Sequence, residues 1–381
     1  MKFIDKLKSL RHKFYIWYFC RKPIKRNKII LWADSFKHFG CSPKYIALYL
    51  IKNYPNTFDL VWVFEESVDI PDDMPKAIRV VRYFSIDYLK ELHTAKFVIC
   101  NMRTGQAHMW HKRSDQIYIQ TWHSSLRLKK IEGDALDNLG EDYVKYAKED
   151  SKKIDLLLSG CEFSTEIFKR SFWYNGEILK NGTPRCDILV KGSGEIRYKV
   201  FARYGFSKGV KFALYAPTFR KEKKADVLGM DFKRLKTILE KTTGKKWEIG
   251  CRMHPNILEK LKAEDCVNVS DYSDMQELLC AADILITDYS SCMFDMAIAN
   301  KPCVLFVPDL DNYLSTERGL YFDIEKLPFP IARNMEELDS VLDKFDFEKY
   351  RIKLKEFKNR MGSYERGTAS ASIAEFIIRR T

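Results

Sequence analysis

Two histidines stand where a parallel sheet would present them to a substrate. His123 follows the predicted strand 117–122, and His254 follows the predicted strand 247–253. Ligands of open parallel sheets bind just beyond the carboxyl ends of the strands. A histidine there can accept a proton near neutral pH, because its reference pKa is about 6.5. His123 is therefore a candidate general base. The alternative is a histidine that only hydrogen-bonds its own loop.

A pair of serines follows another strand of the same kind. The apolar run 284–287 leads into the tetrapeptide 288–291, which ends in Ser290 and Ser291, and residues 294–299 have helical spacing. A helix amino terminus offers free N–H groups and a positive dipole end to a phosphate. Serine also caps helices without binding anything. The spacing alone favours capping.

Cations follow two of the strands. Arg220 comes after the run 212–215, and Arg127, Lys129 and Lys130 come shortly after His123. Guanidinium groups match the geometry of phosphate, so an anionic substrate is one interpretation. For Arg127, Lys129 and Lys130 the other interpretation is the solvated face of an ordinary helix. No carboxylate cluster with metal-ligand spacing stands out, and we expect neither a metal nor another cofactor.

The elements that would position these residues alternate between strand and helix. The predicted strands are 29–33, 60–64, 79–81, 97–101, 117–122, 155–159 and 177–181, and later 212–215, 247–253, 267–269, 284–287 and 304–307. Such alternation is typical of parallel sheets of Rossmann type. A chain of 381 residues exceeds one comfortable core. The Gly and Pro residues of the loop 181–187 indicate a domain boundary shortly after it.

The first 28 residues are strongly basic. They hold ten Lys or Arg against one acid, within a chain of net charge +13. Apolar residues at Phe3, Leu7, Leu10, Phe14 and Trp17 share one helix face. A basic amphipathic helix of this kind suits an anionic membrane surface. The alternative is a helix packed on the protein's own core. No signal peptide and no apolar run long enough to span a membrane is present.

The ten cysteines form no CxxC pair, and several lie inside apolar runs. We expect buried, reduced thiols of a cytosolic protein.

Several motifs occur together and in a particular order. They are QTWHSSLRLKKIEGD at 120–134, NGTPRCD at 181–187, YAPTFR at 215–220, MHP at 253–255, ITDYSSCMFD at 286–295 and YLSTERG at 313–319, with FKHFGCSPKYI at 36–46 near the start. This set resembles the CDP-glycerol glycerophosphotransferase family, whose members build teichoic acids and related polymers. The resemblance covers nearly all of residues 30–340.

The resemblance implies an α/β protein of the GT-B fold, with two Rossmann-like domains facing a cleft. The expected segments are a basic amphipathic membrane-associating segment (1–28), an acceptor domain (29–190), a CDP-donor domain (191–361) and a helix crossing back to the first domain (362–381). The implied reaction moves a polyol phosphate, most simply glycerol phosphate, from CDP-glycerol or CDP-ribitol to a hydroxyl of an undecaprenyl-linked glycan, with release of CMP. The implied location is the cytoplasmic face of the membrane, as a peripheral protein.

The resemblance also implies roles for residues. The catalytic residues would be His123 and His254. The donor's phosphates and CDP would be bound by Thr218, Arg220, Pro255, Thr287, Asp288, Ser290, Ser291, Arg318 and Gly319. The acceptor side would include Trp122, Ser124, Ser125, Lys129, Lys130 and Arg185. The family usually has Gly-Thr where this chain has Ser124-Ser125, and the added Cβ of Ser124 would strain a conformation with positive φ.

Two other functions remain as alternatives. One is a GT-B glycosyltransferase that uses a CMP-sugar, similar to a sialyltransferase. The other is a nucleic-acid-binding protein, suggested by the net charge of +13. The concentration of positive charge at one end and the lack of a recognisable nucleic-acid-binding motif argue against it, so no nucleic-acid partner is expected. The sequence leaves glycerol versus ribitol, and one addition versus polymerisation, open.

Overall fold

The computed structural model of the chain describes residues 2–104, 110–218, 229–253, 266–316 and 319–381, with the backbone alone at 2–9 and 316. The chain divides into two compact units. Unit 1 comprises residues 1–123, 132–187 and 364–381, and unit 2 comprises residues 124–131 and 188–363. Each unit contains its own parallel sheet.

The sheet of unit 1 has the strand order β3-β2-β1-β4-β5-β6-β7. Its strands are β1 (Lys25–Trp32), β2 (Asp59–Phe64), β3 (Ile78–Arg82), β4 (Ala95–Cys100), β5 (Ile117–Gln120), β6 (Leu156–Ser159) and β7 (Glu177–Lys180). The central strands are continuous apolar runs that are buried along most of their length, as a sheet covered on both faces requires. The chain order reverses between β1 and β4, which makes their carboxyl ends the place where a ligand is expected.

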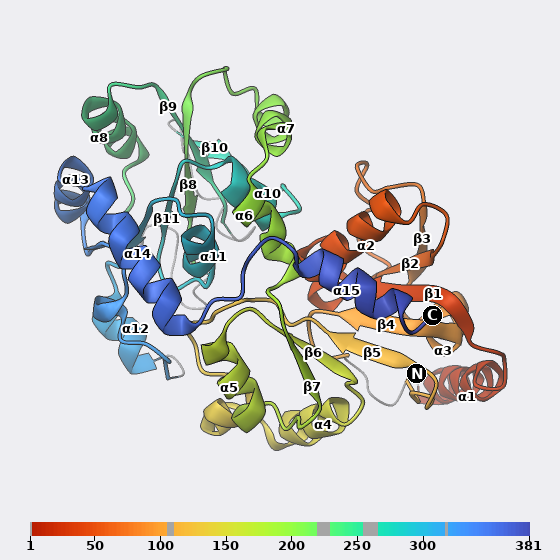
Figure 1. The fold of residues 1–381 in the computed structure, drawn as a ribbon. Coiled ribbons are helices and arrows are strands. Elements are labelled where there is room, and N and C mark those ends of the chain that lie inside the picture. Colours follow the sequence, from red (N-terminus) through yellow and green to blue (C-terminus); the bar gives the residue numbers. More distant parts are fainter. Residues whose placement is uncertain (1, 105–109, 219–228, 254–265, 317–318) are drawn as a thin grey trace. The chain divides into compact units, whose positions relative to one another are not determined.

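Helices cover this sheet. They are α1 (Lys2–Phe19), η1 (Asp34–Phe36), α2 (Cys41–Asn53), α3 (Ile86–Thr94), η3 (Glu132–Asn138), α4 (Glu141–Ser151), α5 (Glu162–Ser171), η4 (Pro184–Cys186) and α15 (Ala369–Ile378). Figure 1 shows α15, from the end of the chain, beside α2 from near its start. Ile373 and Ile377 of α15 share one buried core cluster with Ile46 of α2 and Trp62 of β2.

The sheet of unit 2 has the order β10-β9-β8-β11-β12-β13. Its strands are β8 (Lys211–Ala216), β9 (Trp247–Cys251), β10 (Val267–Asn268), β11 (Ile284–Thr287), β12 (Cys303–Phe306) and β13 (Ile331–Ala332). Its helices are α7 (Gly194–Tyr204), α8 (Phe232–Thr243), α10 (Met275–Ala281), α11 (Cys292–Ile298), α12 (Leu310–Thr316), η6 (Ile324–Lys326), α13 (Met335–Asp343) and α14 (Phe347–Met361), while α6 (Asp187–Lys191) leads into the unit. Here the chain order reverses between β8 and β11.

The predicted α/β class with two Rossmann-like domains is confirmed. One expected range is not continuous, because residues 124–131 lie within 29–190 but belong to unit 2. Their backbone is the reason. Lys129 forms an antiparallel bridge with Leu320, and the N–H of Lys130 donates to the carbonyl of Gly319 at 2.9 Å. Local sequence patterns cannot predict a pairing between segments that are almost 200 residues apart, so the sequence did not predict that residues 124–131 belong to unit 2.

The basic first segment is shorter than residues 1–28. Strand β1 already begins at Lys25, and Lys28 is 1% exposed. Its ammonium ion-pairs with Glu91 and donates to Thr94 at 2.8 Å. Lys28 is therefore part of the core of unit 1 and cannot contribute to a basic surface.

Helix α1 packs against α3 (Figure 1). Ile16 and Phe19 are buried, whereas Leu10, Phe14 and Trp17 of the predicted apolar face are each more than half exposed, at 56%, 57% and 53%. Within the described part of the chain, every helix is too short or too polar to cross a bilayer. Cysteines 100, 280 and 303 are buried free thiols, as predicted.

Candidate functional site

The turn after β1 has three successive residues in an unusual backbone conformation. Asp34, Ser35 and Phe36 have φ of 47°, 56° and 70° in succession, although none is glycine. The side chain of Asn101, just after β4, accepts from the N–H of Asp34 at 2.9 Å and donates to its carboxylate at 2.8 Å. This pair joins the two strands at which the chain order reverses. Costly backbone conformations of this kind gather at functional sites.

His123 lies at the same edge, after β5. It is half-buried, and its Nδ1 lies 3.4 Å from the carbonyl oxygen of Asn101. A carbonyl can only accept, so in this contact Nδ1 carries the hydrogen, and in the neutral imidazole the lone pair is then on Nε2. That tautomer is the one a general base needs. The structure therefore gives His123 a partner that the sequence did not reveal.

Trp122 supports the histidine from the preceding position. Its backbone has φ of 51°, and its ring lies 4.5 Å from the ring of His123 and edge-on to Phe172 at 4.9 Å. The side chain is 6% exposed, and its Nε1 has no hydrogen-bond partner among the described residues. A buried indole N–H normally finds a partner, and Nε1 of Trp122 is an exception to that rule.

Arg185 was expected on the acceptor side. In the structure its guanidinium donates to the carbonyl of His123 and lies 3.8 Å from the sulfur of Cys41. The Arg185 guanidinium thus contacts the backbone of His123 within unit 1. A direct role toward an acceptor stays a prediction.

The rest of the 181–187 motif binds the end of the chain. The carboxylate of Glu365 accepts from the N–H and hydroxyl of Thr183, at 3.1 and 2.8 Å. Asp187 accepts from the N–H groups of Ala369 and Ser370. The 181–187 motif thus attaches the segment 365–370 to the rest of unit 1.

Unit 2 has a hydrogen-bonded pair comparable to Asp34 and Asn101, at the strands β8 and β11 where its chain order reverses. Asp288, after β11, is 1% exposed and accepts from the N–H of Thr218, which follows β8, at 2.9 Å. It also accepts from the Thr218 hydroxyl at 2.5 Å, and Thr287 donates to the carbonyl of Ala216 at 2.6 Å. These predicted donor-binding residues hold the two strand ends together. Their contact with a donor is untested.

Ser290 and Ser291 lie just beyond this pair and are half-buried. Ser291 stands at the N-cap of α11, but its side chain makes no capping hydrogen bond. The hydroxyl of Ser290 accepts from the N–H of Cys292 only at 3.5 Å, the limit for such a bond. Capping therefore accounts poorly for both serines, and phosphate binding stays a prediction.

Three of the sequence motifs meet in unit 2. Tyr289 of 286–295 stacks on Tyr313 of 313–319, and the ammonium of Lys129 from 120–134 lies 5.2 Å from the Tyr313 ring. Gly319 is so close to Lys130 that a Cβ there would lie 3.2 Å from its side chain. Lysines 129 and 130, expected on the acceptor side, thus adjoin the Gly319 loop expected to bind the donor.

Serines 124 and 125 also belong to unit 2 and are buried. Four other expected site residues, Arg220, His254, Pro255 and Arg318, lie outside the described residues. Within the described ranges, no cluster of three or more His, Cys, Asp or Glu side chains could hold a metal ion.

Sequence reasoning missed Asp34 and Asn101. Asp34 follows the predicted strand 29–33 and Asn101 is the last residue of the predicted strand 97–101, so the rule that selected His123 at a strand end could have selected them. Their hydrogen bond joins residues 67 positions apart, which no spacing pattern reveals.

Comparisons with known proteins agree with this geometry. A sequence model described as "CDP-Glycerol:Poly(glycerophosphate) glycerophosphotransferase" matches residues 14–379. The teichoic acid poly(glycerol phosphate) polymerase of Bacillus spizizenii is 31% identical over 377 residues, which cover 93% of each chain. The teichoic acid glycerol-phosphate transferase of Staphylococcus aureus is 29% identical over 375 residues, covering 93% of this chain and 94% of that protein.

A solved structure of a variant of the wall teichoic acid polymerase TagF, soaked with CDPG, has a TM-score of 0.82 and 30% identity, and covers 100% of this chain and 98% of that one. The predicted GT-B class is confirmed. These matches give no support to the CMP-sugar or nucleic-acid alternatives.

Proposed function

Because the chain belongs to the CDP-glycerol:poly(glycerophosphate) glycerophosphotransferase family, we propose that it transfers glycerol phosphate from CDP-glycerol to a hydroxyl of a lipid-linked glycan. CMP is the second product. The relatives' names support glycerol phosphate as the transferred group and teichoic acid synthesis as the process. The observation that carries the proposal is the setting of His123, a strand-end histidine whose Nδ1–H is held by the Asn101 carbonyl.

The proposed reaction is one displacement at the β-phosphorus of the donor. The acceptor oxygen forms a bond to this phosphorus while the bond to the bridging oxygen breaks, and that oxygen leaves with CMP. Nε2 of His123 takes the proton of the acceptor hydroxyl. Positioning and charge neutralisation supply most of the acceleration in such transfers.

The donor's phosphates are assigned to Ser290 and Ser291, with Thr218, Thr287, Asp288 and Gly319 around them. Support comes from the two serine hydroxyls, which are only weakly used in capping α11. Arg220, Pro255 and Arg318 complete the proposed donor set, and His254 is assigned to contact the donor's phosphates or to support proton transfer. Trp122, whose indole N–H is buried without a described partner, is assigned to the acceptor.

The enzyme is proposed to act as a peripheral protein on the cytoplasmic face of the membrane. Three large apolar side chains of α1 are exposed, and Arg21 and Lys22 lie over the rings of Trp17 and Tyr18. Cations beside exposed aromatic rings suit an anionic lipid surface. The acceptor, an undecaprenyl-linked glycan, would be reached there.

The test measures CMP release with CDP-glycerol, CDP-ribitol and CMP-sialic acid in the presence of a lipid-linked glycan, with product masses determined. We expect release from CDP-glycerol, and His123→Ala should lower its rate by roughly 100- to 10,000-fold while CMP binding persists. His111→Ala, at an exposed histidine of unit 1, is the matched control. Release from CMP-sialic acid alone, or a near-normal rate for His123→Ala, would overturn the proposal.

A further inference from the structure

The segment that carries His123 begins and ends in strained backbone. Trp122 precedes it with φ of 51°, and Glu132 follows residues 124–131 with φ of 50°. Neither residue is glycine, and they are only 6% and 4% exposed. Side chains rarely adopt this conformation, so each must be held in place by its surroundings. Between these two points the chain leaves unit 1 and returns to it.

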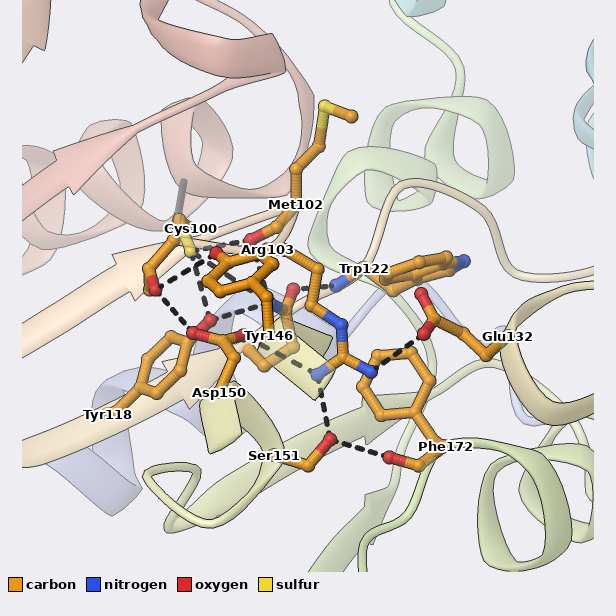
Figure 2. Close-up of polar contacts among 12 residues, drawn as sticks. Cys100, Met102, Arg103, Tyr118, Trp122, Glu132, Tyr146, Asp150, Ser151 and Phe172 are labelled. Atoms are coloured by element: carbon orange, nitrogen blue, oxygen red, sulfur yellow. Dashed lines mark hydrogen bonds and ion pairs between the residues drawn. The ribbon is translucent and has the colours of Figure 1, made fainter. Parts of the chain in front are cut away.

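One buried pair of side chains contacts both strained residues (Figure 2). The guanidinium of Arg103 donates to the Glu132 carboxylate at 3.1 Å and lies 3.9 Å from the ring centroid of Phe172. Phe172 in turn packs edge-on against Trp122 at 4.9 Å. The contact continues from Trp122 to His123 at 4.5 Å. Arg103 is thus connected to both ends of the segment.

Arg103 also contacts two residues at the end of α4, in addition to Glu132 and Phe172. Its guanidinium donates to the hydroxyl of Ser151 at 2.8 Å and to Asp150 at 3.4 Å, and the Ser151 hydroxyl donates to the carbonyl of Phe172 at 2.6 Å. The side chains of Arg103 and Asp150 are 6% and 0% exposed. The planar guanidinium matches this arrangement of acceptors, which an ammonium group could satisfy only in part.

Stability alone explains this cluster poorly. Taking an arginine and two carboxylates out of water is costly, and apolar residues of similar volume often serve a core equally well. Buried ionic groups are instead suited to selecting one geometry. Here the geometry selected is that of the two residues that bound the His123 segment.

We propose that Arg103, acting with Phe172, is a positioning residue for His123. Arg103 holds Glu132 and the Phe172 ring, Phe172 holds the Trp122 ring, and Trp122 sets the plane of the imidazole. The role in turnover rests on the proposed function of His123, whereas the effect on the position of the imidazole does not.

The test compares Phe172→Leu and Arg103→Lys with a matched control, Phe97→Leu. Phe97 is a fully buried phenylalanine of β4 in the core cluster beside α2. We expect both test variants to lower kcat for CMP release by about tenfold or more, because small misplacements of a reacting group are costly, with the KM for CDP-glycerol changed less than about twofold. The control should lose a similar amount of thermal stability and keep its kcat.

An NMR measurement separates this inference from the proposed function. The imidazole protons of labelled His123 should carry a ring-current shift from Trp122, and Phe172→Leu and Arg103→Lys should change it while Phe97→Leu does not. Unchanged shifts, or equal loss of kcat in the control, would overturn the inference even if His123 is the base. If His123→Ala retains turnover, the proposed function fails, and the ring-current shifts still decide whether Arg103 positions the imidazole.

Discussion

Tyr289 lies face to face with Tyr313, with ring centroids 3.5 Å apart and planes inclined by 11°. The hydroxyl of Tyr289 also donates to Asp309 at 3.0 Å. Stacking and a hydrogen bond together fix the backbone immediately before Ser290 and Ser291. The two serine hydroxyls proposed to bind phosphate thus follow directly on a residue that is held by two contacts.

Replacing both Ser290 and Ser291 with alanine should weaken CMP binding by about 100-fold or more, because hydrogen bonds to a charged group are worth about 1.5–3 kcal/mol each. Isothermal titration calorimetry measures the affinity, and thermal unfolding the stability. Ser207→Ala, at an exposed serine of the same unit, controls for the loss of a hydroxyl. An unchanged affinity with a lowered melting temperature would show that the serines only cap α11.

Replacing Phe14 and Trp17 with serine should abolish binding to vesicles that contain anionic phospholipid. Both side chains are more than half exposed, so thermal stability should change little. Co-sedimentation with vesicles measures the effect, and Tyr198→Ser, at a residue that is 66% exposed in unit 2, is the control. Vesicle binding equal to that of the unmodified chain would leave α1 without a membrane role.

His93 should make the protein sensitive to mild acid. Burial lowers the pKa of His93 from 6.5 to about 4. Between these values the unfolded chain binds the proton and the folded chain does not, so the free energy of unfolding falls as the pH falls. The loss should reach about 3 kcal/mol near pH 4.

Urea unfolding between pH 7 and pH 4 measures this dependence. The variant His93→Gln should show a shallower decline over that window than the unmodified chain, whereas His12→Gln, at a partly exposed histidine of α1, should not. If the free energy of unfolding fell equally with pH for the unmodified chain and for His93→Gln, His93 would not be the cause of the acid sensitivity.

Asp187→Ala should destabilise unit 1 by about 2–3 kcal/mol, since it removes a buried carboxylate that serves two N–H groups at the start of α15. The matched variant Asp346→Ala removes an exposed N-cap, that of α14, and should cost only about 1 kcal/mol. Chemical unfolding compares the two. Equal losses would mean that Asp187 is no more than an ordinary cap.

The sequence was sufficient for what depends on local pattern. The β-branched runs such as 284–287 became buried strands, and polar residues directly after them, including His123 and Asp288, were found at the expected edges of the sheets. The period of the hydrophobic pattern and the position of polar breaks depend only on residues that are close in sequence. The same holds for the free cysteines inside apolar runs.

Contacts between distant segments could not be predicted in this way. The bridge between Lys129 and Leu320 places part of the expected first domain in unit 2. Burial of Lys28 depends on Glu91 from another element, so counting charges overestimated the basic segment. The strained backbone at Trp122 and Glu132 occurs without glycine, and the tertiary contacts of these residues, those with Arg103 and Phe172 among them, are not visible in local sequence.

The return of the chain end to unit 1 has a consequence for how the protein is made. Asn181, Thr183 and Asp187 all bind residues between 365 and 372, so unit 1 cannot complete these contacts until residues 365–372 have been synthesised. All of unit 2 is synthesised in the meantime. A translation product that stops at Ser363 would therefore contain the full sequence of unit 2 but an incomplete unit 1, and quality-control proteases should recognise it by the uncovered apolar face of α2.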